Sequence, residues 1–560
     1  MVKSNFGVII FIAISVLGLA VSTHAEEKSN RSRLREVLES WLPTVGDDSA
    51  PSGSPTTFGD GSSLPLTPAD ILSAEDLKAA LPWRSTSFAN QTGTLGWSES
   101  TFDVPTKMKD RVAFWRDIYA KYTTEQGVLH DSVHVQIVYT PIDFSTIMKD
   151  PSLSFSQKAR AREDFIESKR TEILERLQRL SNVTDSEGLA GDDLRVWEQF
   201  SRIDDPQKFS KAMEKNRIRF QLGQKDRFLL GIYYSGRYLR SMEEIFRKEG
   251  LPIELTRLPF VESSFNVNAR SKVGASGIWQ FMPRTGKEYM KVNKDVDERN
   301  DPLISTRASA RLLKQNYQML QSWSLALTGY NHGAYGVRSI TQKFGTDDLS
   351  ELIEKDPTLA FGFASQNFYA CFLAALEVER NASLAFSDPK WSPEIESADF
   401  KTGSSQSWRA FLEFFDGDET LAKSLNPHLT SRVREGKAKI PVGIVLRAPP
   451  NRVRVAENFF SGKFPASKIG TQLKGLPMPK SLYSASSVLT AARSVIRARL
   501  AQPPKTSQLV LPEILASVPR TAEASLRAPL TPAHDDDEPE VLSIFNPRPA
   551  SYRSSGEESP

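Results

Sequence analysis

Apolar side chains at helical spacing recur through the middle of the chain and indicate a mostly α-helical protein. The clearest stripe consists of Leu251, Leu255, Leu258, Val261 and Phe265. Their steps of four, three, three and four residues describe one face of an α-helix. The segment 107–248 carries apolar residues at the same spacing among many charged ones, and only 134–144 reads as a strand or an extended connection. We therefore expect a helical N-terminal domain at 107–248, followed by a second helical domain at 249–390.

The first 25 residues have the pattern of a secretory signal peptide. Lys3 precedes an apolar run, Phe6–Val21, and small residues lead up to a plausible cut after Ala25. An uncleaved membrane anchor is the alternative. No later stretch reaches the ~18 apolar residues that a membrane-spanning helix needs. We expect an exported protein without a stable membrane anchor, located in the periplasm or cell envelope or secreted.

Composition changes at both ends of this helical region. Residues 26–106 are rich in Ser, Pro and Gly, which predicts a flexible leader with one short helix near Arg33–Trp41. Residues 451–560 are rich in Pro, Ser, Ala and Arg. We expect this tail to be largely disordered, because so few large apolar side chains cannot offset the entropy lost on ordering.

Net charge and cysteine content exclude several kinds of site. A formal net charge of +3 on 71 basic and 68 acidic residues gives no reason to expect nucleic-acid binding. Cys371 is the only cysteine, so an internal disulfide and a thiolate zinc site are both excluded. It lies in an apolar helical run and should be a small buried hydrophobe. We expect neither a metal nor a cofactor.

One glutamate occupies an unusually acid-poor stretch. In 261–283, VESSFNVNARSKVGASGIWQFMP, Glu262 is the sole carboxylate, and it lies at the edge of the apolar stripe described above. Pro259, three residues earlier, removes a backbone donor and is expected to kink the helix. Apolar surroundings disfavour the charged form of a carboxyl group and raise its pKa. A glutamate that stays protonated near neutral pH can act as a general acid; the alternative is an ordinary solvated or ion-paired side chain.

Two further segments carry aromatic and amide side chains next to glycine. One is Gly277-Ile278-Trp279-Gln280, and the other is Gly329-Tyr330-Asn331-His332-Gly333. Flat apolar faces and neutral amides suit a carbohydrate, whose ring faces are apolar and whose hydroxyl and N-acetyl groups need donors and acceptors. This combination favours a glycan-binding cleft around Glu262.

Glu262-Ser263, the Gly277–Gln280 segment, Tyr330-Asn331 and the tyrosine of Asn367-Phe368-Tyr369 together resemble the motif set of soluble lytic transglycosylases. The arrangement is most similar to the membrane-bound lytic murein transglycosylase D group, over about 250–380. The resemblance implies a goose-type lysozyme-like helical domain that cleaves the MurNAc–GlcNAc β-1,4 bond of peptidoglycan. The reaction uses no water and leaves a 1,6-anhydro-MurNAc end. Peptidoglycan glycan strands are the implied partner, and we expect a monomer.

The resemblance also implies roles for individual residues. Glu262 would be catalytic, and the implied substrate-binding set is Ser263, Gln280, Met282, Tyr330, Asn331 and Tyr369. Ser263 would orient the glutamate or contact sugar, although a helix-terminal hydroxyl often bonds its own backbone instead. Met282 could equally be a core residue, and Trp279 more plausibly is one. Tyr369 would donate a hydrogen bond to Glu262, with the adjacent Phe368 as the competing position.

A single carboxylate distinguishes this chemistry from ordinary glycoside hydrolysis, which uses two. Glu262 would first protonate the leaving oxygen and then, as a carboxylate, deprotonate the C6 hydroxyl that closes on C1. A nearby acidic cluster consists of Glu288, Asp295, Asp297, Glu298 and Asp301. We expect them to form a solvated loop. If one folded back, the protein would be a muramidase; a non-catalytic glycan-binding protein is the remaining alternative.

Residues 400–450 resemble a degenerate LysM-like module of the α+β type. Short helices are expected near Trp408–Phe415 and Thr420–Leu425, followed by a strand near Ile440–Leu446. The strand that usually precedes the first helix is not evident. The module would bind glycan or, alternatively, pack on its neighbour and steady it.

Overall fold

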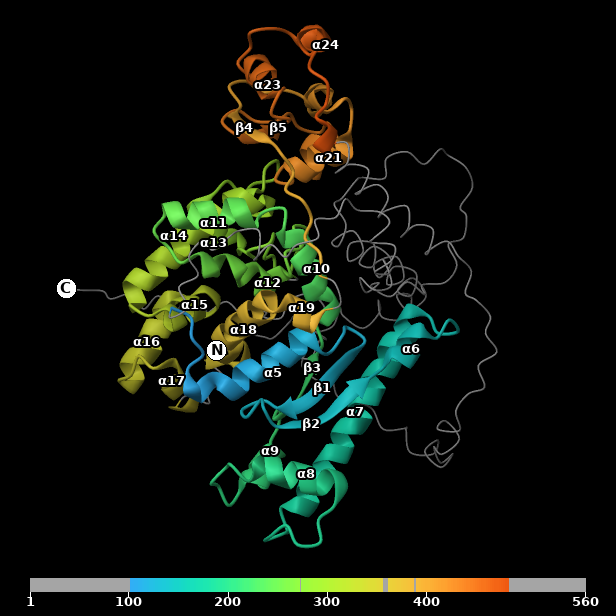
Figure 1. The fold of residues 1–560 in the computed structure, drawn as a ribbon, viewed down its shortest axis with the longest axis vertical. Helices are drawn as coiled ribbons and strands as arrows, with labels where there is room; N and C mark the ends of the chain where they lie inside the picture. The colour runs from blue at the N-terminus through green and yellow to red at the C-terminus, as the bar shows by residue number, and fades with distance from the viewer. Residues whose placement is uncertain (1–100, 272, 356–360, 387–388, 483–560) are drawn as a thin grey trace, which may run out of the picture.

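The computed structural model describes residues 101–271, 273–355, 361–386 and 389–482 (Figure 1). The predicted signal peptide, the helix near Arg33–Trp41 and residues 483–560 of the predicted tail lie outside these ranges. Within the ranges, no helix combines the length and apolar character that crossing a bilayer requires. The fold is mostly helical, as predicted from the spacing of apolar residues.

A helical body occupies the centre of the molecule (Figure 1). Its helices are α5 (Lys109–Ala120), α10 (Lys225–Ser235), α11 (Leu239–Lys248), α12 (Leu258–Ser263), α13 (Pro283–Tyr289), α14 (Pro302–Leu320), α15 (Trp323–His332), α16 (Ala334–Phe344), α17 (Leu349–Lys355), α18 (Phe363–Arg380) and α19 (Ala382–Ala385). Three 3₁₀ turns, η1 (Thr106–Met108), η2 (Ile253–Arg257) and η3 (Glu298–Asn300), connect them. Helix α18 runs through the middle and packs against α5, α12 and α15.

The core of this body crosses the domain boundary expected at 248/249. One continuous cluster of buried apolar side chains extends from Phe102 to Trp391, and Cys371 is a fully buried member of it, as predicted. Helix α18 is buried around nearly its whole circumference, so it needs helices on every side. Helix α5, from the N-terminal segment, provides one of those covers. The segment 107–248 is therefore not a separate domain.

A small sheet interrupts the predicted all-helical N-terminal segment. Strands β1 (Gln126–Asp131), β2 (Val138–Asp143) and β3 (Ile218–Leu222) form an antiparallel sheet in the order β2-β1-β3. Strand β2 lies inside the stretch predicted to be extended, whereas β1 and β3 were not predicted. Both are short and mix polar with apolar residues, so neither shows the clean alternation that identifies a strand.

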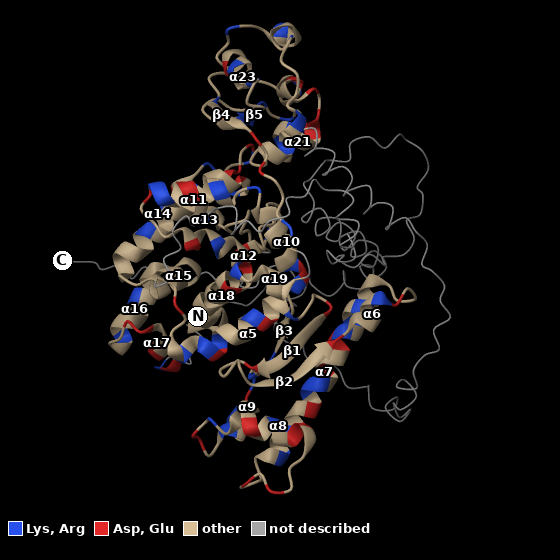
Figure 2. Cartoon of the chain, viewed as in Figure 1, with Lys and Arg blue, Asp and Glu red and all other residues tan. Residues whose placement is uncertain are grey.

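Four helices accompany the sheet and bury a second, smaller apolar cluster against it. They are α6 (Ser145–Lys149), α7 (Phe155–Leu180), α8 (Gly191–Phe200) and α9 (Lys208–Ala212). In the predicted stripe of α7, Ile173, Leu177 and Leu180 are buried, while Leu174 is 36% exposed. Figure 2 shows charges of both signs along α7, as expected of a helix with one solvent face.

A C-terminal module forms one end of the molecule (Figure 1). Its elements are β4 (Ala398–Lys401), α20 (Trp408–Leu412), η5 (Glu413–Phe415), α21 (Glu419–Leu425), α22 (Ser431–Arg434), β5 (Val445–Ala448), α23 (Val453–Phe460), η6 (Ala466–Lys468) and α24 (Ile469–Gln472). Strands β4 and β5 pair antiparallel. Strand β4 therefore precedes the first helix, at a place where no clear strand was predicted. The LysM resemblance itself stays a prediction.

The module extends further than expected, because residues 451–482 are ordered rather than part of a disordered tail. Phe459, Phe460, Ile469, Met478 and Leu482 all belong to the apolar core of the module. The Pro- and Arg-rich composition of this segment did not indicate these core residues, because they are few. They are large, however, and they lie close together in space. The boundary at 450 was wrong, and the ordered module reaches Leu482.

A buried ionic cluster attaches the module to the helical body. Asp301, at the start of α14, accepts hydrogen bonds from Arg447 of β5 and lies 3.1 Å from Nδ1 of His428. Asp301 and His428 are 0% exposed and Arg447 is 5% exposed. The charge and hydrogen bonds of Arg447 and His428 outweigh burial and hold the pKa of Asp301 well below its ordinary value. We call these three residues the Asp301 clamp.

Candidate functional site

The helix that carries Glu262 is shorter than its apolar stripe predicted. The 3₁₀ turn η2 leads into α12, which ends at Ser263. Pro259 lies in the first turn of α12, where a missing N–H costs nothing, so it starts the helix rather than kinking it. Ser264 and Phe265 both have left-handed backbones, with φ of 50° and 57°. All five residues of the stripe are nevertheless buried, so the sequence identified the buried face correctly.

Glu262 sits near the C-terminus of α12 as a half-buried carboxyl group. Within the described part of the chain, its carboxylate accepts no hydrogen bond and forms no ion pair. Desolvation raises its pKa to about 8, and no neighbouring carboxylate contributes to the shift. At neutral pH the group is therefore mostly protonated, as a proton donor must be.

Hydrogen bonds join the Glu262 helix to two other motifs through successive carbonyl groups. Ser263 Oγ lies 2.9 Å from the carbonyl oxygen of Ile278, and 3.4 Å from that of Pro259 in its own helix. The Tyr330 hydroxyl donates to the next carbonyl, that of Trp279, at 2.8 Å. Ser263 therefore acts in positioning the second motif against the first. Trp279 is fully buried, the core role favoured from the sequence.

Gln280, in the second motif, is held by its own amide group. Its Nε2 donates to the carbonyls of Ala269 and Gly277 at 3.1 and 2.8 Å, which fixes the orientation of the amide. Among the described residues, the buried Oε1 atom has no hydrogen-bond partner. Gly277 has φ of 77°, and a Cβ there would lie 1.9 Å from the carbonyl oxygen of Arg299. Only glycine permits this turn, which holds the Gln280 amide in place.

The third motif is hydrogen-bonded to α18, the helix that carries the fourth. Ser365 of α18 donates to Oδ1 of Asn331 at 3.0 Å and lies 3.2 Å from Nδ1 of His332. Met282 is half-buried at the start of α13. The structure thus brings the motifs of Ser263, Gln280 and Asn331 into one connected network, and Ser365 is a member that sequence reasoning missed.

The tyrosine of the last motif lies elsewhere than expected. Tyr369 is 4% exposed, and burial together with Asp103 raises its pKa to about 12, but within the described residues it makes no hydrogen bond to Glu262. Its neighbour Phe368 faces the site instead, stacked on Tyr330 with ring centroids 6.5 Å apart. Successive helix positions diverge by about 100°, so Phe368 and Tyr369 cannot serve the same cleft.

A second tyrosine near Glu262 comes from far upstream. Burial raises the pKa of Tyr119 well above its usual range, with smaller contributions from Cys371 and from the Glu262 charge. Burial and Glu262 likewise raise the pKa of Tyr330. Tyr119 lies in α5, outside every recognised motif, and only the packing of α5 on α18 could have revealed it.

The acidic loop is solvated only in part: Glu288 is exposed and Asp295 partly exposed, whereas the other three acids are buried, contrary to expectation. Asp297, Glu298 and Asp301 are buried, and each has partners. Asp297 pairs with Arg299, which in turn donates to the carbonyls of Gly274 and Phe281 at 2.7 and 2.9 Å. The loop therefore braces the segment that carries Gln280, and its buried carboxylates are occupied by their own partners.

A mostly helical body defines the class of domain, together with a desolvated glutamate, Glu262, that has no hydrogen bond or ion pair among the described residues and is set among the motifs above. Residues 242–353 match the family model described as the transglycosylase SLT domain, which confirms the resemblance inferred from the motifs. Two curated relatives are each named membrane-bound lytic murein transglycosylase D, from Escherichia coli strain K12 and from strain O6:H1. Each is 38% identical over 89 residues, or 16% of this chain and 20% of the relative.

A third relative, from Alteromonas sp. (strain M-1), is named for resistance to tributyltin chloride. It is 34% identical over 98 residues, or 17% of this chain and 47% of that protein. The chain spans about a fifth of the two E. coli relatives and about half of the Alteromonas protein. The similarity thus concerns the segment around Glu262, and neither the sheet nor the C-terminal module is part of the SLT match.

Proposed function

We propose that this protein is a peptidoglycan lytic transglycosylase of the cell envelope that cleaves MurNAc–GlcNAc β-1,4 bonds and leaves 1,6-anhydro-MurNAc ends. The observation that carries the proposal is the lone carboxyl group of Glu262, with a pKa raised to about 8 by desolvation. Its neighbours, Tyr330 and the amide of Gln280, present the aromatic and polar groups that a glycan requires.

In the proposed reaction, Glu262 acts twice. Its carboxyl group first donates its proton to the glycosidic oxygen as the bond from that oxygen to C1 of MurNAc breaks. The resulting carboxylate then takes the proton of the C6 hydroxyl as O6 bonds to C1, so the glutamate ends protonated again. No water is consumed, and no second carboxylate is needed to place one.

Tyr330 lies near the carboxyl group of Glu262. Burial and the negative charge of ionised Glu262 both oppose ionisation of the Tyr330 hydroxyl group, so Tyr330 stays a neutral hydrogen-bond donor in both steps. Gln280 Oε1 is buried and has no hydrogen-bond partner among the described residues, so a small shift of the loop would let it accept a hydrogen bond from a sugar hydroxyl or N–H.

The pH dependence of turnover follows from the raised pKa. The value of kcat/KM should be level through neutral pH and fall about tenfold per pH unit above pH ~8, because the reactive form of free Glu262 is protonated. An ordinary glutamate, with a pKa of about 4.3, would instead lose activity above pH ~5. Initial rates on soluble glycan strands between pH 5 and 10 distinguish the two profiles.

The mass of the product tests the type of reaction. Digestion of purified sacculi should give muropeptides one water lighter than the reducing-end products of a hydrolase, as measured by mass spectrometry. A muramidase, the second candidate, requires a water-activating carboxylate across the cleft. Reducing ends alone would establish the hydrolase and overturn the proposal.

A further inference from the structure

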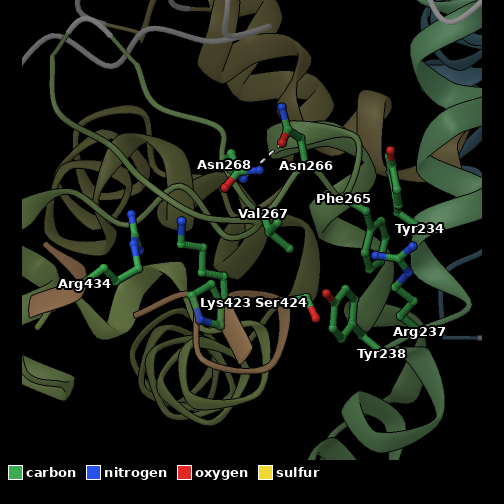
Figure 3. Close-up of a pocket in the computed structure, with 11 residues that line it drawn as sticks. Tyr234, Arg237, Tyr238, Phe265, Asn266, Val267, Asn268, Lys423, Ser424 and Arg434 are labelled. Carbon is green, nitrogen blue, oxygen red and sulfur yellow. Dashed lines mark hydrogen bonds between the residues drawn. The ribbon is translucent and has the colours of Figure 1, made fainter. Parts of the chain in front are cut away.

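A small, solvent-open hollow lies where the C-terminal module meets the loop after α12. Figure 3 shows the lining residues. One wall is the loop segment Phe265–Asn268. The facing wall carries Lys423 of α21 and Arg434 of α22, and Arg237 and Tyr238 complete the lining. Two parts of the chain that are distant in sequence therefore build one site.

The lining is cationic. It includes three basic side chains and no acidic one. Arg237 is 9% exposed; its Nε donates to Ser392 at 3.0 Å, and its guanidinium lies 5.2 Å from the ring centroid of Tyr234. In the described ranges, no carboxylate forms an ion pair with Arg237. A buried cation without a counter-ion is costly, so the hollow is prepared for an anion.

Nearby acids do not neutralise the hollow. Glu419 lies 3.1 Å from Lys423, and Glu435 lies beside Lys437 at the surface. Arg434 interacts electrostatically with both glutamates, which attract it, and with Arg270, which repels it. The basic groups around the hollow therefore remain in excess.

The hollow and the catalytic glutamate share one short loop. The backbone N–H of Asn266 donates to the carbonyl of Ser263 at 3.1 Å, and that of Asn268 donates to the side chain of Asn266 at 3.0 Å. The left-handed backbone of Ser264 and Phe265 turns the chain from Glu262 directly into the wall of the hollow. A ligand in the hollow is thus held by residues that directly follow the catalytic helix.

We propose that this hollow binds a carboxylate of the peptide attached to the glycan strand under cleavage. The inference rests on the proposed function and adds the peptide to the substrate. Glycan hydroxyls and N-acetyl groups carry no charge, and in an intact strand the lactyl carboxyl group of MurNAc is amide-linked, so the free carboxylates belong to the peptide. Lys423, Arg434 and Arg237 would bind the carboxylate, and Tyr238 and Phe265 would contact its aliphatic neighbours.

The test compares two substrates and one matched pair of variants in the full chain. Glycan strands with intact peptides and the same strands stripped by an amidase are digested by wild type, Arg434→Gln and Arg409→Gln. Arg409 is an exposed arginine of α20 in the same module. Arg434→Gln should lower kcat/KM on peptide-bearing strands at least tenfold, since a hydrogen bond to a charged group is worth about 1.5–3 kcal/mol. Arg409→Gln should match wild type on both substrates.

A binding measurement separates this inference from the proposed function. Calorimetry on the Glu262→Gln chain should show tighter binding of a disaccharide-peptide than of the bare disaccharide, and Lys423→Gln should remove most of that difference. Equal losses on both substrates, or a peptide effect that persists in both variants, would overturn the inference. Failure of wild type to cleave either kind of strand would instead count against the proposed function.

Discussion

Replacing Glu262 with glutamine should lower turnover of peptidoglycan by about 10³–10⁴-fold, because general acid–base catalysis contributes a factor of that size at its upper range. Glutamine keeps the shape of the side chain but can neither give nor take the proton. Release of soluble muropeptides from sacculi measures the effect. Glu288→Gln, at an exposed position of α13, is the matched control and should retain wild-type turnover.

The Glu262→Gln substitution should stabilise the fold near pH 8. This effect distinguishes a loss of catalysis from a loss of folded structure. The pKa of Glu262 is about 8 in the folded protein and about 4.3 in an unfolded chain. The folded state therefore binds more protons in this window, and wild type loses stability as pH rises from about 4 to 8. Glutamine has no such loss, so the difference in Tm between Glu262→Gln and wild type should widen across that range. If Glu262→Gln were inactive and had a lower Tm than wild type at every pH, the expected stabilisation would be wrong. The lost activity would then be attributed to the fold and not to the missing proton donor.

Removal of the buried carboxylate from the Asp301 clamp should have the largest effect on stability. In Asp301→Ala, Arg447 and His428 would remain buried without their partner, and breaking such a pair costs about 3–5 kcal/mol. The variant also loses the side-chain cap on Leu303 and Ile304 at the start of α14, worth about 1 kcal/mol. At an unfolding entropy of about 2.1 cal/mol/K per residue, a unit of this size loses about 1–1.5 °C per kcal/mol, so Tm should fall by roughly 5–8 °C in calorimetry.

A second ion pair across the same interface provides the control. Asp295 and Arg432 lie 2.9 Å apart but are 26% and 42% exposed, so Asp295→Asn should cost at most about 1 kcal/mol. Combining Asp301→Asn with Arg447→Met should cost less than the two single changes added together, because neither residue is then left unpaired. Additive losses would mean that the two side chains act independently and that the clamp has no coupling.

Sequence periodicity was sufficient for the buried faces of long helices but not for where the elements end. The stripe from Leu251 to Phe265 is buried throughout, yet the helix stops at Ser263 because the next two residues adopt left-handed backbones. No glycine marks that turn, so propensity gave no warning. The strands β1 and β3 are defined by pairing with each other, a non-local property that a short mixed sequence does not reveal.

For the candidate site, the motifs located residues whose contacts are local and missed those supplied by distant packing. Ser263, Gln280, Tyr330 and Asn331 do lie in one hydrogen-bonded network. The choice between Phe368 and Tyr369 depended on the rotation of α18, which its uniformly apolar sequence does not fix. The position of Tyr119 near Glu262 depends on which helix packs against α18, and tertiary packing of this kind is not evident from the sequence.

The continuous apolar core around α18 has a practical consequence for the design of truncated proteins. A fragment trimmed to the 242–353 match would lack both α5 and α18 and would leave α12 and α15 with bare apolar sides. The family match therefore locates the candidate site but not a fragment that can fold. The smallest fragment expected to fold must include α18 and the helices that pack around it.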